Sequence, residues 1–312
     1  MAAIQMSRFA ILDIGTNTFH LLIVEKQPDG SHKILFKTEQ FVKLGEESIT
    51  HIGDAAFERG IALLKTYRTQ LDKYKVEKVI AFGTAAIRRA DNSAQFINEA
   101  KKQTGIEIKK ISGDEEAQFI YYGARWAVEL DEHPALIMDI GGGSTEFIIA
   151  NKEKIFWEHS YPLGASVLRQ AYNRHNAMTN TEIKALNDYL ETTLQPLIEQ
   201  LKKHPVKKLV GTSGSFDTLA EMTSHIFYTP AILKGKITFQ ISKSQFEKVY
   251  DTVISLTLEE RLQLKGLKKM RAEMIVVAFI VIKFIIEKIG VNEINQSEYA
   301  LKEGILWSIL HT

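Results

Sequence analysis

The chain has 312 residues, of which 45% are apolar and 25% are charged, and its formal net charge is +1. This length and composition favour a globular protein with two domains, and the near-neutral charge argues against broad binding of nucleic acid or of a membrane surface. The absence of cysteine excludes disulfides, thiolate zinc sites, iron–sulfur clusters and cysteine nucleophiles. The longest apolar run, 274–282, is too short to span a bilayer, and the N-terminus lacks the pattern of a signal peptide, so we expect a cytoplasmic protein.

The first part of the chain reads as strands followed by helices. Apolar runs predict strands over 8–15, 19–26 and 32–44, with a hairpin turn at 28–30. Helical spacing of apolar residues follows over 54–74, then a buried strand over 78–83 and short helices. Residues 106–112 alternate as a strand, and 114–130 form a predicted helix with an acidic first turn, which suits the positive end of its dipole.

The same arrangement then begins again. Strands are predicted over 135–143, 144–152 and 154–164, and helices over about 165–174 and 180–203. A strand at 207–215 ends in a glycine turn and is followed by a helix, and another strand covers 236–242. The remainder is mainly helical, apart from a last short strand at 292–297.

The repeated pattern indicates a duplication. Asp13-Ile14-Gly15 corresponds to Asp139-Ile140-Gly141, and His20 falls opposite Glu146 at the same spacing. The sequence therefore predicts two duplicated α/β domains, 1–124 and 125–312, with a cleft between them. The last helix, about 298–312, is predicted to pack back on the first domain.

Each repeat carries a turn suited to phosphate. A strand that ends in Asp-x-Gly places a carboxylate at the tip of a sheet, and the small polar residues that follow turn backbone N–H groups outward as an anion nest. Carboxylates repel phosphate, so Asp13 and Asp139 are predicted to bind a hard cation such as Mg²⁺ that bridges to it. The predicted phosphate-binding residues are Gly15, Thr16, Asn17, Thr18, Gly141, Gly142, Gly143, Ser144 and Thr145, with Gly211, Thr212, Ser213 and Gly214 in a third turn.

Paired Asp-Ile-Gly hairpins resemble those of the actin and sugar-kinase superfamily, which implies two actin-like (ribonuclease H-like) domains. The further motifs at 82–90, 112–117, 211–222, 267–278 and 297–306 narrow the resemblance. In this order they closely resemble the exopolyphosphatase / guanosine pentaphosphate phosphohydrolase (Ppx/GppA) family, in its short two-domain form. The chain departs from the family pattern at Glu273, Ala278 and Lys302, where Asp, Gly and Arg are usual.

The resemblance implies hydrolysis of a terminal phosphoanhydride in inorganic polyphosphate or guanosine pentaphosphate. It implies Glu116 as the catalytic base, Arg88 as a phosphate contact, and Asp139 with Glu146 as support for Mg²⁺ and water. A homodimer is expected, and no nucleic-acid or membrane partner. Without the resemblance, Glu116 reads more simply as a carboxylate that stabilises its helix start. Two rival functions stay open, namely an ATP-dependent kinase of the same fold and a non-catalytic sensor of polyphosphate or alarmone.

Overall fold

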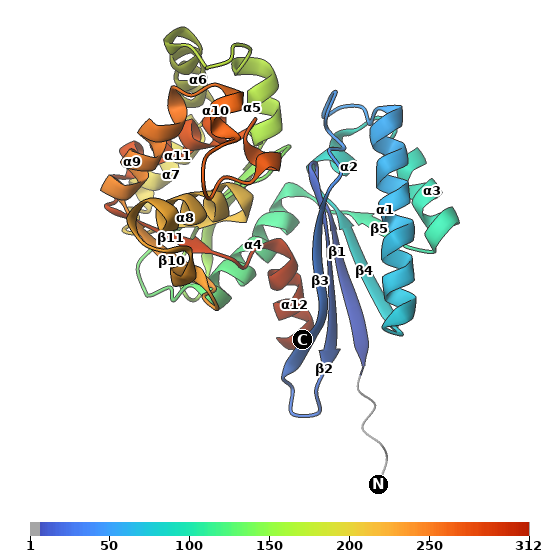
Figure 1. The fold of residues 1–312 in the computed structure, drawn as a ribbon. Coiled ribbons are helices and arrows are strands. Elements are labelled where there is room, and N and C mark those ends of the chain that lie inside the picture. The colour runs from blue at the N-terminus through green and yellow to red at the C-terminus, as the bar shows by residue number, and fades with distance from the viewer. Residues whose placement is uncertain (1–6, 312) are drawn as a thin grey trace.

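The computed structural model describes residues 7–311, which fold into two lobes with one β-sheet each (Figure 1). The first sheet has the strand order β3-β2-β1-β4-β5, with β1 antiparallel to β2 and parallel to β4. Its strands are β1 (Arg8–Ile14), β2 (Thr18–Lys26), β3 (His32–Phe41), β4 (Lys78–Gly83) and β5 (Ile108–Lys110). The predicted α/β class with two repeated lobes is confirmed.

Three helices cover one face of the first sheet, namely α1 (Asp54–Lys73), α2 (Ala85–Arg89) and α3 (Ser93–Thr104). Their apolar faces pack against alternate residues of β1 and β2, so Leu12, Phe19, Leu64 and Phe96 are fully buried in one core. β1 and β2 are apolar on both faces, which means that a second core must cover the other side of this sheet.

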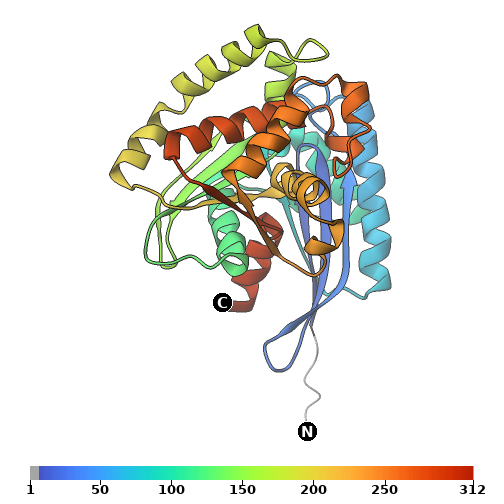
Figure 2. The ribbon, with the colours of Figure 1, turned by 60° about the vertical axis from the view of Figure 1, so that its left-hand side comes forward.

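The second sheet has the order β10-β11-β9-β6-β7-β8, and helices cover its outer face (Figure 2). Its strands are β6 (Ala135–Ile140), β7 (Thr145–Ala150), β8 (Ile155–Tyr161), β9 (Leu209–Thr212), β10 (Thr238–Ser242) and β11 (Glu293–Ser297). The helices of this lobe are α5 (Ala165–Tyr172), α6 (Asn180–Thr193), α7 (Gln195–Lys203), α8 (Ser213–Phe227), α9 (Lys243–Ile254), α10 (Leu258–Arg261) and α11 (Ile275–Ile289), with 3-10 turns η1 (Pro230–Leu233) and η2 (Lys269–Arg271).

Two helices join the lobes. α4 (Gly113–Ala127) and α12 (Leu301–His311) lie side by side next to the inner face of the first sheet (Figures 1 and 2). They share a core with both sheets, in which Ile11 of β1, Ile137 of β6, Ile120 of α4 and Ile305 of α12 are all buried. The division at residue 124 stays a prediction, because α4 belongs to this common core.

The structure differs from the expected elements in three places. The strand expected over 207–215 ends at Thr212, and α8 begins at Ser213 without an intervening turn. The helix expected over 180–203 is two helices, α6 and α7, which meet at Leu194 just before Pro196. Proline has no N–H to donate, so it starts a helix more readily than it continues one. The strand expected over 106–112 is only three residues long, because β5 pairs with β4 along a short stretch at the sheet edge. Within residues 7–311, no helix combines the length and hydropathy needed to cross a bilayer.

Candidate active site

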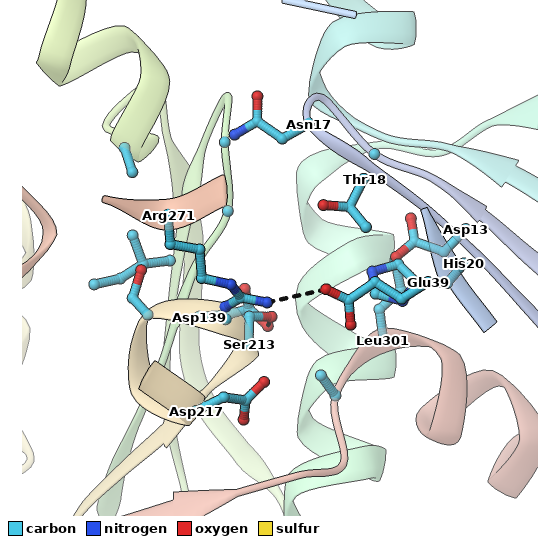
Figure 3. Close-up of a pocket in the computed structure, with 18 of the residues that line it drawn as sticks. Asp13, Asn17, Thr18, His20, Glu39, Asp139, Ser213, Asp217, Arg271 and Leu301 are labelled. Carbon is cyan, nitrogen blue, oxygen red and sulfur yellow. Dashed lines mark hydrogen bonds and ion pairs between the residues drawn. The ribbon is translucent and has the colours of Figure 1, made fainter. Parts of the chain in front are cut away.

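A cavity of about 490 Å³ lies between the lobes and is lined by residues of both (Figure 3). The β1–β2 turn and β3 contribute from the first lobe, and the β6–β7 turn, the start of α8 and η2 from the second. The first turns of α4 and α12 add Glu116 and Lys302. The predicted cleft between two repeated hairpins therefore corresponds to a cavity.

The two hairpins have the same local geometry. In β1–β2 the Gly15 N–H donates to the carbonyl of Thr18 at 3.1 Å, and in β6–β7 the Gly141 N–H donates to the carbonyl of Ser144 at 3.0 Å. Asp13 pairs with His20 across one hairpin, and Asp139 pairs with Glu146 across the other. The correspondence read from the sequence is thus reproduced in the backbone and in the strand register.

The tips of the hairpins touch each other across the cavity. The Asn17 amide donates to Ser166 Oγ at 2.8 Å. Ser166 lies at the start of α5, after the second hairpin. A Cβ on Gly142 would lie 2.5 Å from the Asn17 amide nitrogen, and one on Gly143 would lie 2.6 Å from Thr16 Oγ1. We expected these glycines to clear space for phosphate. In this structure they also clear space for the opposite hairpin.

The segment predicted as the third glycine turn orients one of the predicted metal ligands. Thr212 Oγ1 and Ser213 Oγ each donate to Asp139 Oδ2 at 2.6 Å. Ser213 adopts a left-handed φ of 65° at the start of α8, a conformation that costs energy for a non-glycine residue. Strained backbone of this kind occurs mostly where function holds a side chain in place, and here it aims a hydroxyl at the Asp139 carboxylate.

Not every predicted residue faces the cavity. Thr145, Gly211, Thr212 and Glu146 do not line it, although Ser144 and Ser213 do. The Thr145 hydroxyl is buried and donates to the Leu163 carbonyl at 2.8 Å. A Cβ on Gly211 would lie 2.0 Å from the Phe216 ring, so this glycine serves packing. Glu146 is buried and accepts a hydrogen bond from Ser160 Oγ at 2.6 Å.

Glu116 lies in the first turn of α4, where its position is fixed by a capping box. Ser112 Oγ accepts from the Glu115 N–H, and the Glu115 carboxylate accepts from the Ser112 N–H. Glu116 is only 7% exposed, and burial raises the pKa of its carboxyl to about 7 against the opposing effect of Arg88. A buried carboxyl with this pKa is suited to accept a proton near neutral pH.

Arg88 lies behind Glu116 rather than in the cavity. Its Nη1 donates to Glu116 Oε2 at 2.8 Å and to the Ile111 carbonyl at 3.1 Å. Arg88 lines a second, smaller hollow and not the main cavity. The two residues named as catalytic from the resemblance are therefore brought together as an ion pair, which sequence spacing alone did not indicate.

The carboxyl groups of Asp13, Glu116 and Asp139 in the cavity and of Glu146 beside it influence one another. Burial raises the pKa of Asp13 to about 7, Lys302 opposes the rise, and Asp139 adds to it. Burial also raises the pKa of Asp139, and it raises that of Glu146 well above its ordinary value, with Glu116 and Asp139 as further causes. Burial is the largest cause of each of these shifts, so the carboxyl groups hold protons more readily here than in water.

This donor set fits a hard cation that keeps some of its water. Asp13 Oδ1 is buried and lacks a hydrogen-bond partner among the residues that the structure describes. Within residues 7–311, no three Asp, Glu, His or Cys side chains stand close enough together to hold a metal ion directly. Mg²⁺ commonly binds through one or two carboxylates, waters and substrate phosphates, and Asp13 and Asp139 would hold it in that manner. Glu146 would act through its effect on Asp139.

Cations in the cavity were not assigned from the sequence. Arg271, Lys302, Lys37, Lys236 and Lys268 all line it. Burial lowers the pKa of the Lys302 ammonium, but Glu303, Asp13 and Asp217 raise it above its ordinary value. Lys302 therefore stays protonated. Arg271 and Lys302 fall inside the motifs at 267–278 and 297–306. Their place in the site could not be predicted, because both lie far along the chain from the hairpins.

His20 contributes a neutral ring to the cavity. Burial lowers the pKa of its imidazole well below the ordinary value, and Lys302, Arg271 and Lys37 lower it further. A neutral imidazole can donate with one ring nitrogen and accept with the other, which suits hydrogen bonding to phosphate oxygens or water.

Ion pairs across the cleft hold the lobes together. Arg271 Nη2 lies 3.1 Å from Glu39 Oε1 of the opposite lobe (Figure 3). Lys37 Nζ likewise lies 2.8 Å from Glu298 Oε1. Both cations line the cavity, so a polyanion entering it would compete with these carboxylates for them.

Asp217 gives the stability of the protein a pH dependence. Burial raises its pKa from 3.8 to about 6, although Arg271 and the Gln296 amide at 2.9 Å oppose the rise. The folded state therefore retains a proton that the unfolded chain loses, and the free energy of unfolding falls as pH rises from about 4 to 6. The contribution lost is at most about 3 kcal/mol.

Urea unfolding of the wild type and of Asp217→Asn at pH 4.5 and 7.5 measures this effect. We expect a smaller loss of stability between the two pH values in the variant, which has no proton to release. An equal loss in both proteins would contradict the raised pKa of Asp217.

The fold has counterparts in known proteins. A model of the Ppx/GppA phosphatase family matches residues 22–312. The structure of an exopolyphosphatase from Cytophaga hutchinsonii superposes with a TM-score of 0.94 at 35% identity, covering 98% of each chain. The Ppx/GppA family member from Aquifex aeolicus has a TM-score of 0.80 at 27% identity, also over 98% of each chain.

A longer relative is similar in sequence. Guanosine-5'-triphosphate,3'-diphosphate pyrophosphatase of Aeromonas hydrophila is 26% identical over 304 residues. The match covers 97% of this chain but 59% of the relative, so the chain spans less than two thirds of that protein.

Proposed function

The chain belongs to the Ppx/GppA phosphatase family, and from this we propose that it is a phosphoanhydride hydrolase. Its proposed reaction releases the terminal phosphate of inorganic polyphosphate or the 5′ γ-phosphate of guanosine pentaphosphate. Similarity to an exopolyphosphatase and to a guanosine pentaphosphate pyrophosphatase supports both substrates, which present the same reacting group.

The observation that carries the proposal is the position of Glu116. Its carboxyl lines the cavity that both glycine hairpins also line, and burial raises its pKa to about 7. Phosphoryl transfer needs charge neutralisation, an oriented nucleophile and in-line geometry. A partly protonated carboxylate opposite two anion nests supplies a base for water where a terminal phosphate would sit.

In the proposed reaction, a water oxygen forms a bond to the terminal phosphorus while the bridging P–O bond breaks. Glu116 accepts one proton of that water, and the bridging oxygen stays with the shortened chain. Backbone N–H groups of the two hairpins, together with Lys302 and Arg271, bind phosphate oxygens and hold the chain in place. Mg²⁺, when bound through Asp13 and Asp139, supplies further charge neutralisation.

Phosphate release tests the proposal. We expect release from long-chain polyphosphate, tripolyphosphate or guanosine pentaphosphate in the presence of Mg²⁺, and a loss to background after chelation with EDTA. The preferred substrate is the one with the highest kcat/KM. Release that continues undiminished in EDTA would refute the metal-dependent mechanism, and no release from any of the three would refute the hydrolase.

Two ion pairs favour the rival reading as a sensor. Arg88 holds Glu116 in an ion pair, and the lobes are bridged by Arg271 and Glu39. A binding protein could keep such contacts permanently, whereas an enzyme must exchange them during turnover. Tight binding of polyphosphate or of guanosine pentaphosphate by calorimetry, without any phosphate release, would identify the sensor.

A further inference from the structure

A second hollow, of about 330 Å³, opens next to the main cavity on the side of Arg88. We propose that it is the exit for the orthophosphate produced at Glu116, an inference that rests on the proposed function. The residues that carry the argument are Arg88, Arg89, Ser144, His159 and Ser160, which all line this hollow.

The hollow and the main cavity share one lining residue and are linked by polar contacts between their linings. Ser144, at the end of the second hairpin turn, lines both. Glu116 lines the cavity, Arg88 lines the hollow, and their ion pair of 2.8 Å joins the two. Ser160, also in the hollow, donates to the buried Glu146 at 2.6 Å. A phosphate ion passing this boundary would meet hydrogen-bonding groups.

The outer end of the hollow carries basic side chains. The lining of the hollow contains two Arg residues, a single carboxyl group at Asp114, and His159. Arg89, Asp114 and His159 are exposed, so they form the outer end of this path. The exposed Arg89 guanidinium would attract an orthophosphate dianion that reaches this end of the hollow.

The proposed reaction makes a second opening useful. Attack on the terminal phosphorus leaves orthophosphate between Glu116 and the shortened chain, which still occupies the main cavity. Leaving by the way that the substrate entered would require the chain to dissociate first. Arg88 can exchange the Glu116 carboxylate for the phosphate, because a guanidinium binds both in the same two-point geometry. The predicted contact of Arg88 with phosphate is then a contact with the product.

Arg89→Glu tests the exit, because Arg89 is exposed at its outer end and has no assigned part in the reaction. Rapid acid quench measures the cleavage of substrate in a single turnover. A fluorescent phosphate sensor measures the release of orthophosphate into solution. We expect cleavage within about twofold of the wild type and release slowed on the order of tenfold, seen as a burst of bound phosphate. Arg89→Gln should show a smaller delay. Lys65→Glu, a charge reversal on the exposed face of α1, should show none.

Release that keeps pace with cleavage in Arg89→Glu would overturn the exit. So would an equal slowing of both steps, since that would place Arg89 in the chemistry. Binding of inorganic phosphate, measured by ³¹P NMR without substrate, separates this inference from the proposed function. We expect Arg89→Glu to weaken it at least about fivefold. If the wild type is inactive but Arg89→Glu still weakens phosphate binding, the hydrolase proposal is refuted and the phosphate site is retained. If Arg89→Glu leaves phosphate binding unchanged, the phosphate site is refuted.

Discussion

Glu116→Gln is expected to lower the rate of phosphate release by on the order of 100- to 10,000-fold, the usual contribution of a positioned general base. The amide keeps the size of the carboxyl but cannot accept a proton from water. Polyphosphate binding should persist or tighten, because the change removes one negative charge from the lining of the cavity. Steady-state kinetics and calorimetry on the same preparation measure both effects.

The neighbouring residue provides a matched control. Glu115→Gln changes the same functional group one position away, where the side chain is about half exposed and caps the helix. Glutamine serves in a capping box as glutamate does, so this variant should keep nearly the full rate. A rate for Glu116→Gln within tenfold of the wild type would remove Glu116 from the role of base.

The pH profile gives the same residue a second signature. Burial raises the pKa of Glu116 to about 7, so the wild-type rate should increase with pH through that value and then level off as the base loses its proton. The residual rate of Glu116→Gln should lack this increase. An unchanged profile in the variant would assign the titration to another group.

The parts of the site that depend on local sequence could be predicted. Asp13 and Asp139 each end an apolar strand before a glycine turn, so their positions follow from periodicity and turn chemistry within a few residues. The duplication then places both at the same cleft. The fold class follows from the same information, because repeated strand–turn–strand units with intervening helices leave few alternatives.

The parts of the site that depend on tertiary packing could not be predicted from the sequence. The pairing of Arg88 with Glu116 requires α2 and α4 to meet across 28 residues of sequence. Lys302 and Arg271 reach the cavity from segments more than 250 residues beyond Asp13, and no local pattern reports that approach. The space that Gly142 leaves open for Asn17 likewise depends on how the lobes close, so a glycine read as a phosphate contact has a second role.

Gly304→Ala is expected to destabilise the protein strongly. Gly304 lies inside α12 and Gly123 inside α4, although glycine costs about 1 kcal/mol relative to alanine within a helix. A Cβ on Gly304 would lie 1.7 Å from the Phe119 carbonyl oxygen, and one on Gly123 would lie 2.1 Å from that of Ala300. Both obstacles are backbone atoms, so the helices must separate. We expect a loss of about 3 kcal/mol or more, which exceeds the gain in helix propensity.

The same substitution should also damage the site, because the two helices carry its residues in their first turns. Lys302 lies in the first turn of α12 and Glu116 in that of α4, so separation of the helices moves a cation and the proposed base apart. We expect a melting temperature lower by about 5 °C or more, with reduced phosphate release below that temperature. Ser308→Ala, one turn further along α12, removes a hydroxyl that donates to the Ile305 carbonyl at 2.8 Å and should cost about 1 kcal/mol. A Gly304→Ala protein as stable and active as Ser308→Ala would show that α4 and α12 are not held in close contact, and that the position of Glu116 does not depend on α12.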